Sequence, residues 1–119
     1  MVYDKHRTAF ALVEGHVILR DGQKVATIAF KFPRDGAGRL QAFVHWVGLS
    51  MFRGIAGGYG YDKRSAACAR ASEALALAVS RDVLEYPWAA AFVAALGHDD
   101  GHGWDWHLRA AGFDVLQAI

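Results

Sequence analysis

The sequence predicts an α+β fold, in which an antiparallel sheet of about four to five strands carries two to three helices on one face. Three observations predict it. The first half alternates apolar and polar residues, which is the period of a half-buried strand. The second half places apolar residues three and four apart, which is the period of an amphipathic helix. The closing residues alternate again and predict a strand that returns to the sheet.

Length and composition predict a single domain over residues 1–119. A chain of 119 residues, 54% hydrophobic and 21% charged, is an ordinary globular mixture. Its one cysteine excludes an internal disulfide. No apolar stretch approaches the ~20 residues of a membrane helix, and no hydrophobic signal region follows the first residues. We therefore expect a cytoplasmic protein.

Strands are expected over four segments of the first half: His6–Val13, His16–Arg20, Lys24–Phe32 and Leu40–Phe52. Asp21-Gly22 lies between two of these apolar runs and is the strongest short signal for a hairpin. Within the third strand, Ala26, Ile28 and Phe30 share one face. Pro33 ends this strand because proline cannot donate to a ladder.

A long helix is expected over residues 62–80, with Asp62 as its N-cap and Ser65 as a second candidate for that position. Its apolar residues recur three and four apart and predict a buried stripe. They are Cys68, Ala71, Leu75, Ala78 and Val79.

Two shorter helices and a final strand are expected after this helix. Pro87 fits the first position of a helix that Gly97 ends. A third helix begins at Trp104 and is closed by Gly112. Residues 113–119 alternate and predict the returning strand.

The segment Gly54–Lys63 holds four glycines between a predicted strand and a predicted helix. Such a loop can bind a phosphate through backbone N–H groups and the helix dipole. The glycine spacing here matches neither phosphate-binding pattern, G-x-x-x-x-G-K-[ST] or G-x-G-x-x-G. Asp62 would also repel a phosphate. The segment is therefore interpreted as a tight turn, and we expect no cofactor.

Residues 98–107 are rich in potential metal ligands: His98, Asp99, Asp100, His102, Asp105 and His107. Their spacing matches no recognised metal motif, so the segment is interpreted as a polar loop. A metal site and an acidic recognition surface are the alternatives. Cys68 falls on a predicted core face, and no serine lies in a nucleophile-elbow pattern. We expect no catalytic residue and no metal.

Charge is distributed unevenly along the chain. Residues 1–70 carry eleven Lys or Arg against five Asp or Glu, a net of +6, and residues 71–119 carry two against seven, a net of −5. The basic half suggests a nucleic-acid-binding surface as one hypothesis, because aromatic residues among basic strands can stack on bases. Its candidate residues are Lys31, Arg34, Arg39 and Arg53. A sheet covered by helices would instead bury these aromatics in a core.

Trp104 and Trp106 flank Asp105 and cannot both face one core from the same helix. One of them is expected at the surface, where exposed aromatic residues are favoured anchors of protein interfaces.

Two segments carry a resemblance to a known group of proteins. Gly57–Ala67, read as G-G-Y-G-Y-D-K-R-S-A-A, resembles the G-G-x-G-Y-D-K-x-S-A-A signature of small, mostly uncharacterised phage and prophage proteins. Gly103–Ile119 resembles their closing helix and strand. Some proteins of this size and origin are anti-CRISPR inhibitors, which bind and block a Cas protein or complex.

The resemblance implies a non-enzymatic mobile-element protein of the bacterial cytoplasm that inhibits a host defence system by binding. Its most concrete form is an anti-CRISPR protein whose carboxylates imitate nucleic-acid phosphates. The candidate partner-binding residues are Glu85, Asp99, Asp100, Trp104, Asp105 and Trp106. The alternative is a nucleic-acid-binding accessory protein that uses the basic strand half.

Overall fold

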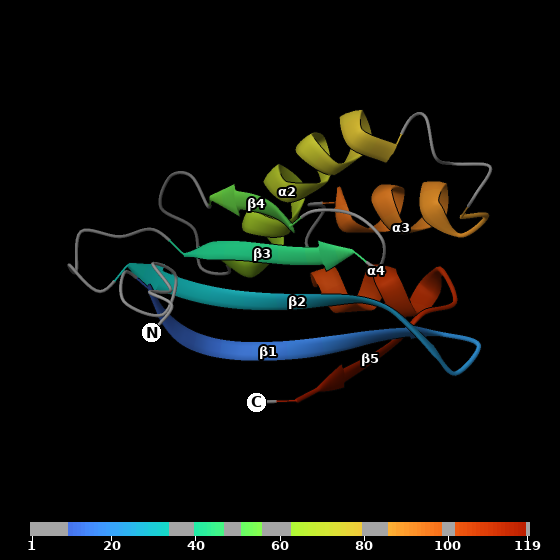
Figure 1. The fold of residues 1–119 in the computed structure, drawn as a ribbon, viewed down its shortest axis with the longest axis horizontal. Helices are drawn as coiled ribbons and strands as arrows, with labels where there is room; N and C mark the ends of the chain where they lie inside the picture. The colour runs from blue at the N-terminus through green and yellow to red at the C-terminus, as the bar shows by residue number, and fades with distance from the viewer. Residues whose placement is uncertain are drawn as a thin grey trace, which may run out of the picture.

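The computed structural model describes residues 10–33, 40–46, 51–55, 63–79, 86–98 and 102–118. It contains a five-stranded antiparallel sheet that three helices contact, so the predicted fold class is confirmed (Figure 1). The strands are β1 (Phe10–Arg20), β2 (Gln23–Pro33), β3 (Gln41–Trp46), β4 (Met51–Ile55) and β5 (Asp114–Gln117). The helices are α2 (Lys63–Val79), α3 (Ala89–Leu96) and α4 (Trp104–Ala110).

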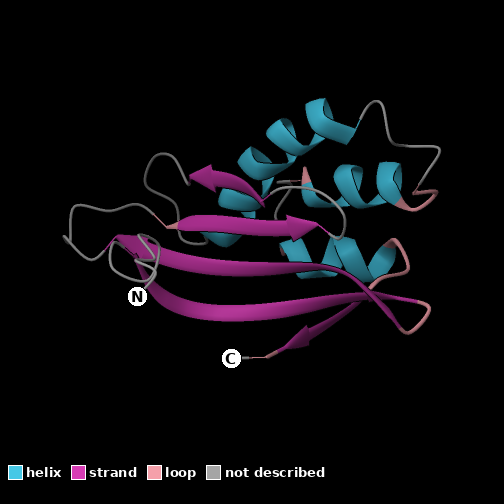
Figure 2. Ribbon diagram, in the orientation of Figure 1, coloured by secondary structure: helices cyan, strands magenta, loops and turns pink. Residues whose placement is uncertain are grey.

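The strand order across the sheet is β4-β3-β2-β1-β5. The first four strands form a meander, and β5 returns to pair with β1 at the opposite edge. The three helices connect these two edges and pack together over the sheet (Figure 2). The chain therefore returns from the helical layer to the sheet only after α4, where it enters β5.

The predicted Asp21-Gly22 hairpin is confirmed. Both residues have positive φ, 51° at Asp21 and 79° at Gly22, as a type I′ turn requires. Arg20 and Gln23 pair on either side of it. This turn joins β1 to β2, the two longest strands of the sheet described.

Two predicted strand boundaries are wrong. Gly15 does not separate two strands, because β1 continues through it with Gly15 paired to Ala29. The register of the β1–β2 pair shifts instead between Leu12 and Glu14 and again between Ile18 and Leu19. The single strand predicted over Leu40–Phe52 is two antiparallel strands, β3 and β4, so the chain reverses between them.

The core lies between the sheet and the helices. Ala26, Ile28 and Phe30 of β2 are fully buried on one face, as their alternation predicts. An aromatic cluster fills one end of the core, where Trp46 stacks on Trp88 with ring centroids 4.8 Å apart. The other members are Tyr86, Phe92 and Phe113.

Helix α2 packs directly on the edge strand β4. Cys68, Ala71 and Leu75 are fully buried, which confirms the predicted stripe at these positions. Ser65 lies inside the helix and not at its N-cap, and Asp62 lies outside the part of the chain described. None of the helices described has the length and apolar character needed to cross a membrane.

The ends of the shorter helices follow their glycines. Gly97 is the C-cap of α3, as predicted. Its N-cap is Trp88, so Pro87 lies just before the helix and not at its first position. Gly112 has a φ of +92° and allows the turn from α4 into β5.

Candidate interaction surface on helix α4

The two tryptophans of α4 have opposite environments. Trp104 is only 4% exposed, and its ring packs 5.3 Å from that of Phe30. Trp106 is 50% exposed. The expectation that they could not share a core is confirmed, but Trp104 belongs to the core and not to the surface. Of the two tryptophans predicted to contact a partner, only Trp106 is therefore exposed in the folded protein.

The start of α4 is anchored from α2. The hydroxyl oxygen of Ser65 accepts the backbone N–H of Trp104 at 3.0 Å, and this contact is buried. The N–H groups in the first turn of a helix have no acceptor within that helix. Ser65 supplies the acceptor for one of them. Sequence reasoning missed this role, because the two residues are far apart along the chain. The anchor orients α4 with Trp104 inward and Trp106 outward.

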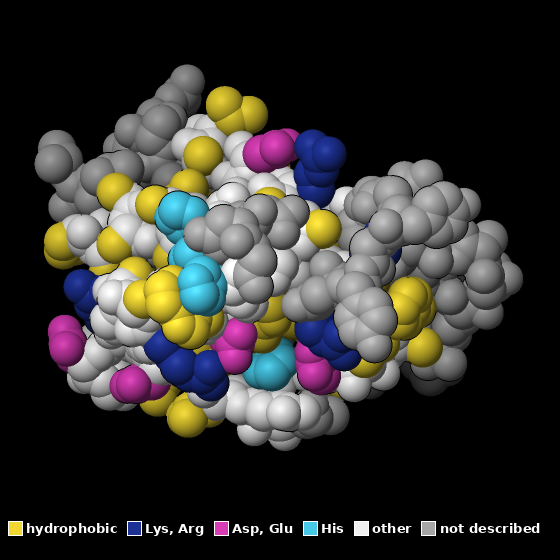
Figure 3. All heavy atoms as spheres, turned by 180° about the vertical axis from the view of Figure 1, so that it is seen from behind, with side chains coloured by type: hydrophobic (Ala, Val, Ile, Leu, Met, Phe, Trp, Pro, Cys, Tyr) yellow, Lys and Arg dark blue, Asp and Glu magenta, His cyan; other side chains and the backbone are white. Residues whose placement is uncertain are grey.

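Trp106 belongs to a group of four packed rings, which we call the ring cluster: His98, His102, Trp106 and His107. His102 stacks on Trp106 with centroids 4.0 Å apart and planes 13° apart. His98 stacks on His107 at 4.3 Å with the same interplanar angle. His107 joins the two stacks, lying edge-on to Trp106 at 5.0 Å. Histidine and hydrophobic side chains gather side by side on this face of the molecule (Figure 3).

A hollow of about 320 Å³ borders the ring cluster. Besides His98 and His107, its lining consists of alanines of α3, α4 and the following turn: Ala91, Ala94, Ala95, Ala110 and Ala111. Within the ranges that the structure describes, no three His, Cys, Asp or Glu side chains are arranged to hold a metal ion. The chemistry of this surface is therefore that of flat ring faces beside a shallow apolar hollow, which suits contact with another macromolecule.

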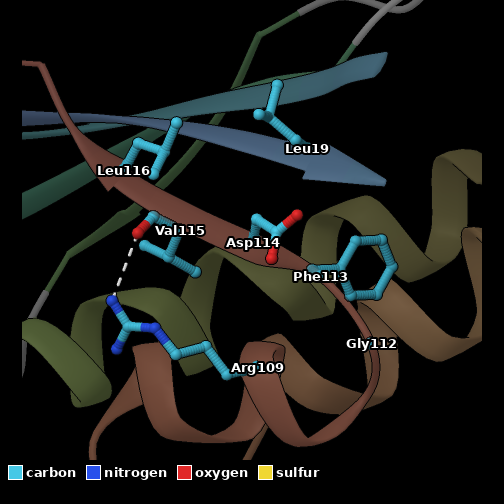
Figure 4. Close-up of a pocket in the computed structure, with 7 residues that line it drawn as sticks. All are labelled: Leu19, Arg109, Gly112, Phe113, Asp114, Val115 and Leu116. Atoms are coloured by element: carbon cyan, nitrogen blue, oxygen red, sulfur yellow. Dashed lines mark hydrogen bonds between the residues drawn. The ribbon is translucent and has the colours of Figure 1, made fainter. Parts of the chain in front are cut away.

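The charge of Asp105 is already compensated. Arg109, four residues along α4, donates to its carboxylate at 2.6 Å. The same guanidinium donates to the backbone carbonyl of Val115 at 3.2 Å (Figure 4). The other predicted acidic contacts, Glu85, Asp99 and Asp100, lie outside the described residues. What the structure describes of this surface is thus aromatic and not strongly acidic.

The predicted basic surface is described only in part. Lys31 lies over the ring of Phe43, 4.9 Å from its centroid, and Phe43 is buried. Arg34 and Arg39 lie outside the described residues, as does the side chain of Arg53. The strand aromatics Phe30 and Trp46 are buried in the core, as the alternative to base stacking predicted, whereas Phe32, next to Lys31 on β2, is 42% exposed.

A polar cluster at the β1–α2 contact was not predicted. Both ring nitrogens of His16 are buried, and within the part of the chain described neither has a hydrogen-bond partner. Nε2 lies 3.6 Å from the Glu14 carboxylate, which accepts a hydrogen bond from the Nε of Arg64. The ring of His16 also packs edge-on to Trp104 at 4.8 Å. The i, i+2 spacing of Glu14 and His16 on one face of a strand was the available sequence signal.

Replacing His16 with leucine is expected to leave the free energy of unfolding unchanged or to raise it by about 1 kcal/mol. A buried polar group without a hydrogen bond costs about 1–3 kcal/mol, and an apolar side chain of similar volume removes that cost. Urea denaturation measures the difference. A loss above about 2 kcal/mol would show that the contacts of His16 with Glu14 and with the rings of Phe30 and Trp104 stabilise the fold by more than its burial costs.

Comparison with known proteins identifies no relative: no family model, no curated protein and no solved structure matches this chain.

Proposed function

We propose that this protein is a non-enzymatic mobile-element protein that inhibits a host defence system by binding. In its most concrete form it is an anti-CRISPR protein that occludes a Cas protein or complex. The observation that carries the proposal is the exposure of Trp106 within the ring cluster. Tryptophan is the residue type most enriched at the energetic centres of protein interfaces. The resemblance of the segments Gly57–Ala67 and Gly103–Ile119 to phage and prophage proteins supports the proposed mobile-element origin.

The geometry of the ring cluster supports this proposal because the rings are held in place before binding. Two ring stacks brace one another, and α4 is anchored to α2 through Ser65. A preordered aromatic surface loses little side-chain entropy when a partner covers it. The hollow beside His98 and His107 gives a partner side chain a place to insert.

A nucleic-acid-binding function has less support from the residues described. Bases stack on exposed aromatic faces. Phe30 and Trp46 are in the core and Phe43 is buried beneath Lys31, which leaves Phe32, 42% exposed, as the exposed aromatic among the described residues of these strands. Beside the ring cluster, Arg109 forms an ion pair with Asp105, so its positive charge is compensated and the described part of this surface is not a basic groove. These placements favour a protein partner over a nucleic acid.

Replacing Trp106 with alanine is expected to weaken binding to the target Cas complex by about 2 kcal/mol, or roughly thirtyfold, because it truncates an interfacial anchor. Capture of purified Cas complexes by the immobilised protein, followed by calorimetry on the complex that binds, measures this change.

The matched control is Leu12→Ala. Leu12 is also exposed and apolar, but it lies on β1 and is not a member of the ring cluster. It should bind like the unmodified protein. If the unmodified protein binds no Cas complex at low salt, the anti-CRISPR proposal is wrong. Equal weakening by both substitutions would instead move the contact surface away from α4.

A further inference from the structure

The sheet face opposite the described helices carries a hollow of about 380 Å³. The β2 residues on this face alternate with the buried residues of that strand, so they point to the side that the core does not use. The register shift that follows Leu12 adds one residue to β1, which brings Leu12 and Gly15 to the same face. Three cross-strand pairs of β1 and β2 form most of the lining: Leu12 with Lys31, Gly15 with Ala29, and Val17 with Thr27.

The hollow is deepest in side-chain terms at the central pair. Gly15 and Ala29 have the two smallest side chains and lie directly opposite one another. The apolar side chains around them are partly exposed, with Leu12 at 43% and Leu116, the β5 partner of Val17, at 53%. A contiguous apolar patch of this kind on a protein surface marks a site of contact with a ligand or partner.

Lys31 supplies a positive charge at one end of the hollow. It is the only Lys, Arg, Asp or Glu among the described residues that line the hollow. Its ammonium lies 4.9 Å from the centroid of the Phe43 ring, and it forms no ion pair in the described part of the chain. Lys31 and Thr27 are four residues apart on one strand, so the hollow extends about 13 Å from the charged end.

A carboxamide with unused hydrogen-bonding capacity lies beside this charge. Gln41 of β3 pairs directly with Lys31, so the two side chains share the same face. Gln41 is 8% exposed, and its buried Oε1 has no hydrogen-bond partner among the residues described. Buried carboxamide groups in proteins are normally hydrogen-bonded. Lys31 and Gln41 are therefore a polar pair able to receive the head group of a ligand.

We propose that this hollow binds a free anionic amphiphile, such as a medium-chain fatty acid. Its carboxylate lies between Lys31 and Gln41, and its acyl chain lies along Gly15 and Ala29 toward Val17. A carboxylate accepts N–H donors from both polar side chains, and the third donor of the ammonium serves Gln41 Oε1. The volume falls within the range of small-molecule sites, which are mostly apolar with a few placed polar groups. A fatty acid of about ten carbons, when extended, has a length comparable to that of the hollow.

Titration with decanoate below its micelle concentration, followed by amide NMR signals, tests the site. We expect saturable shifts centred on Gly15, Val17 and Ala29. Decyltrimethylammonium has the same tail and a positive head group, so it should bind far more weakly. Lengthening the ligand from hexanoate to decanoate should tighten binding roughly threefold per buried methylene. Equal binding of the anionic and cationic amphiphiles would overturn the proposal.

Two substitutions separate the head group from the tail. Lys31→Gln should weaken decanoate binding roughly fivefold, because it removes the charge that faces the carboxylate. Lys24→Gln is the matched control, since Lys24 is an exposed lysine of the same strand that does not line the hollow. Ala29→Leu fills the hollow and should prevent saturable binding. Circular dichroism confirms that each variant is folded. Unchanged binding in either Lys31→Gln or Ala29→Leu would contradict the placement of the ligand.

Other occupants of this face give different results. Sedimentation with vesicles of anionic phospholipid, without saturable binding of free decanoate, would assign the face to a membrane and overturn the proposal. Shifts of the same signals on concentrating the protein alone, with none on adding decanoate, would assign it to a second copy and also overturn it. Trp106→Ala should bind decanoate like the unmodified chain, so this result is independent of binding to a Cas complex.

Discussion

Replacing Gly54 with alanine is expected to destabilise the protein by about 4 kcal/mol or more, or to prevent folding. A Cβ atom at this position would lie under 3.0 Å from backbone atoms of Ala67 and Ala71. Backbone atoms cannot move aside as a flexible side chain can, so α2 would have to withdraw from β4. Its fully buried residues Cys68 and Leu75 would then lose their packing.

The measurement is the urea midpoint, or the yield of folded protein where no transition is seen. Gly22→Ala is the matched control, because a Cβ there meets no atom within 4 Å. Its cost is limited to the strain of a positive φ, about 1–2 kcal/mol. If the two substitutions have equal costs, the close approach of α2 to β4 is not what requires glycine at position 54.

Replacing Trp46 with alanine is expected to cost about 3–5 kcal/mol. Trp46 is 2% exposed and contacts Trp88 and Phe92, with ring centroids at 4.8 and 5.2 Å. Truncation would leave a large cavity at the centre of the aromatic cluster. Chemical denaturation with tryptophan fluorescence measures the change in the free energy of unfolding.

Two further variants test whether the cost of Trp46→Ala comes from lost packing in the core. Trp106→Ala removes the same side chain from a half-exposed position and should cost only about 1 kcal/mol, because it loses the ring contacts with His102 and His107 and leaves no core cavity. Trp46→Phe keeps an aromatic ring and removes an indole N–H that has no hydrogen-bond partner among the residues described. Its cost should be well below that of Trp46→Ala. Equal costs at positions 46 and 106 would contradict the core placement of Trp46.

Much of the fold was predictable from local patterns. The alternation of Ala26, Ile28 and Phe30 identified the buried face of β2, and Asp21-Gly22 identified the hairpin. These signals depend only on residues that are close together in the sequence, so they can be recognised from a single sequence. The division of residues 40–52 into two strands was missed, because alternation looks the same before and after a reversal of direction.

For the candidate site, the sequence predicted that one of two tryptophans is exposed but not which one. The spacing of Trp104 and Trp106 showed that one tryptophan faces outward, but the two are chemically identical in sequence. The structure decides it, because Ser65 anchors Trp104 against Phe30 and His16. The stacking of His98 on His107 and the compensation of Asp105 by Arg109 also depend on how the loop and helix are placed.

The sequence by itself determined the fold class, the hairpin, the buried stripe of α2 and the end of α3 at Gly97. Each depends on periodicity or on the conformational preference of one or two residues. Only the tertiary structure decided that β5 pairs with β1, that Gly54 must lack a side chain, and that Arg109 joins Asp105 to the backbone carbonyl of Val115. These features join residues distant in the chain, and their energies depend on distances that no local pattern records.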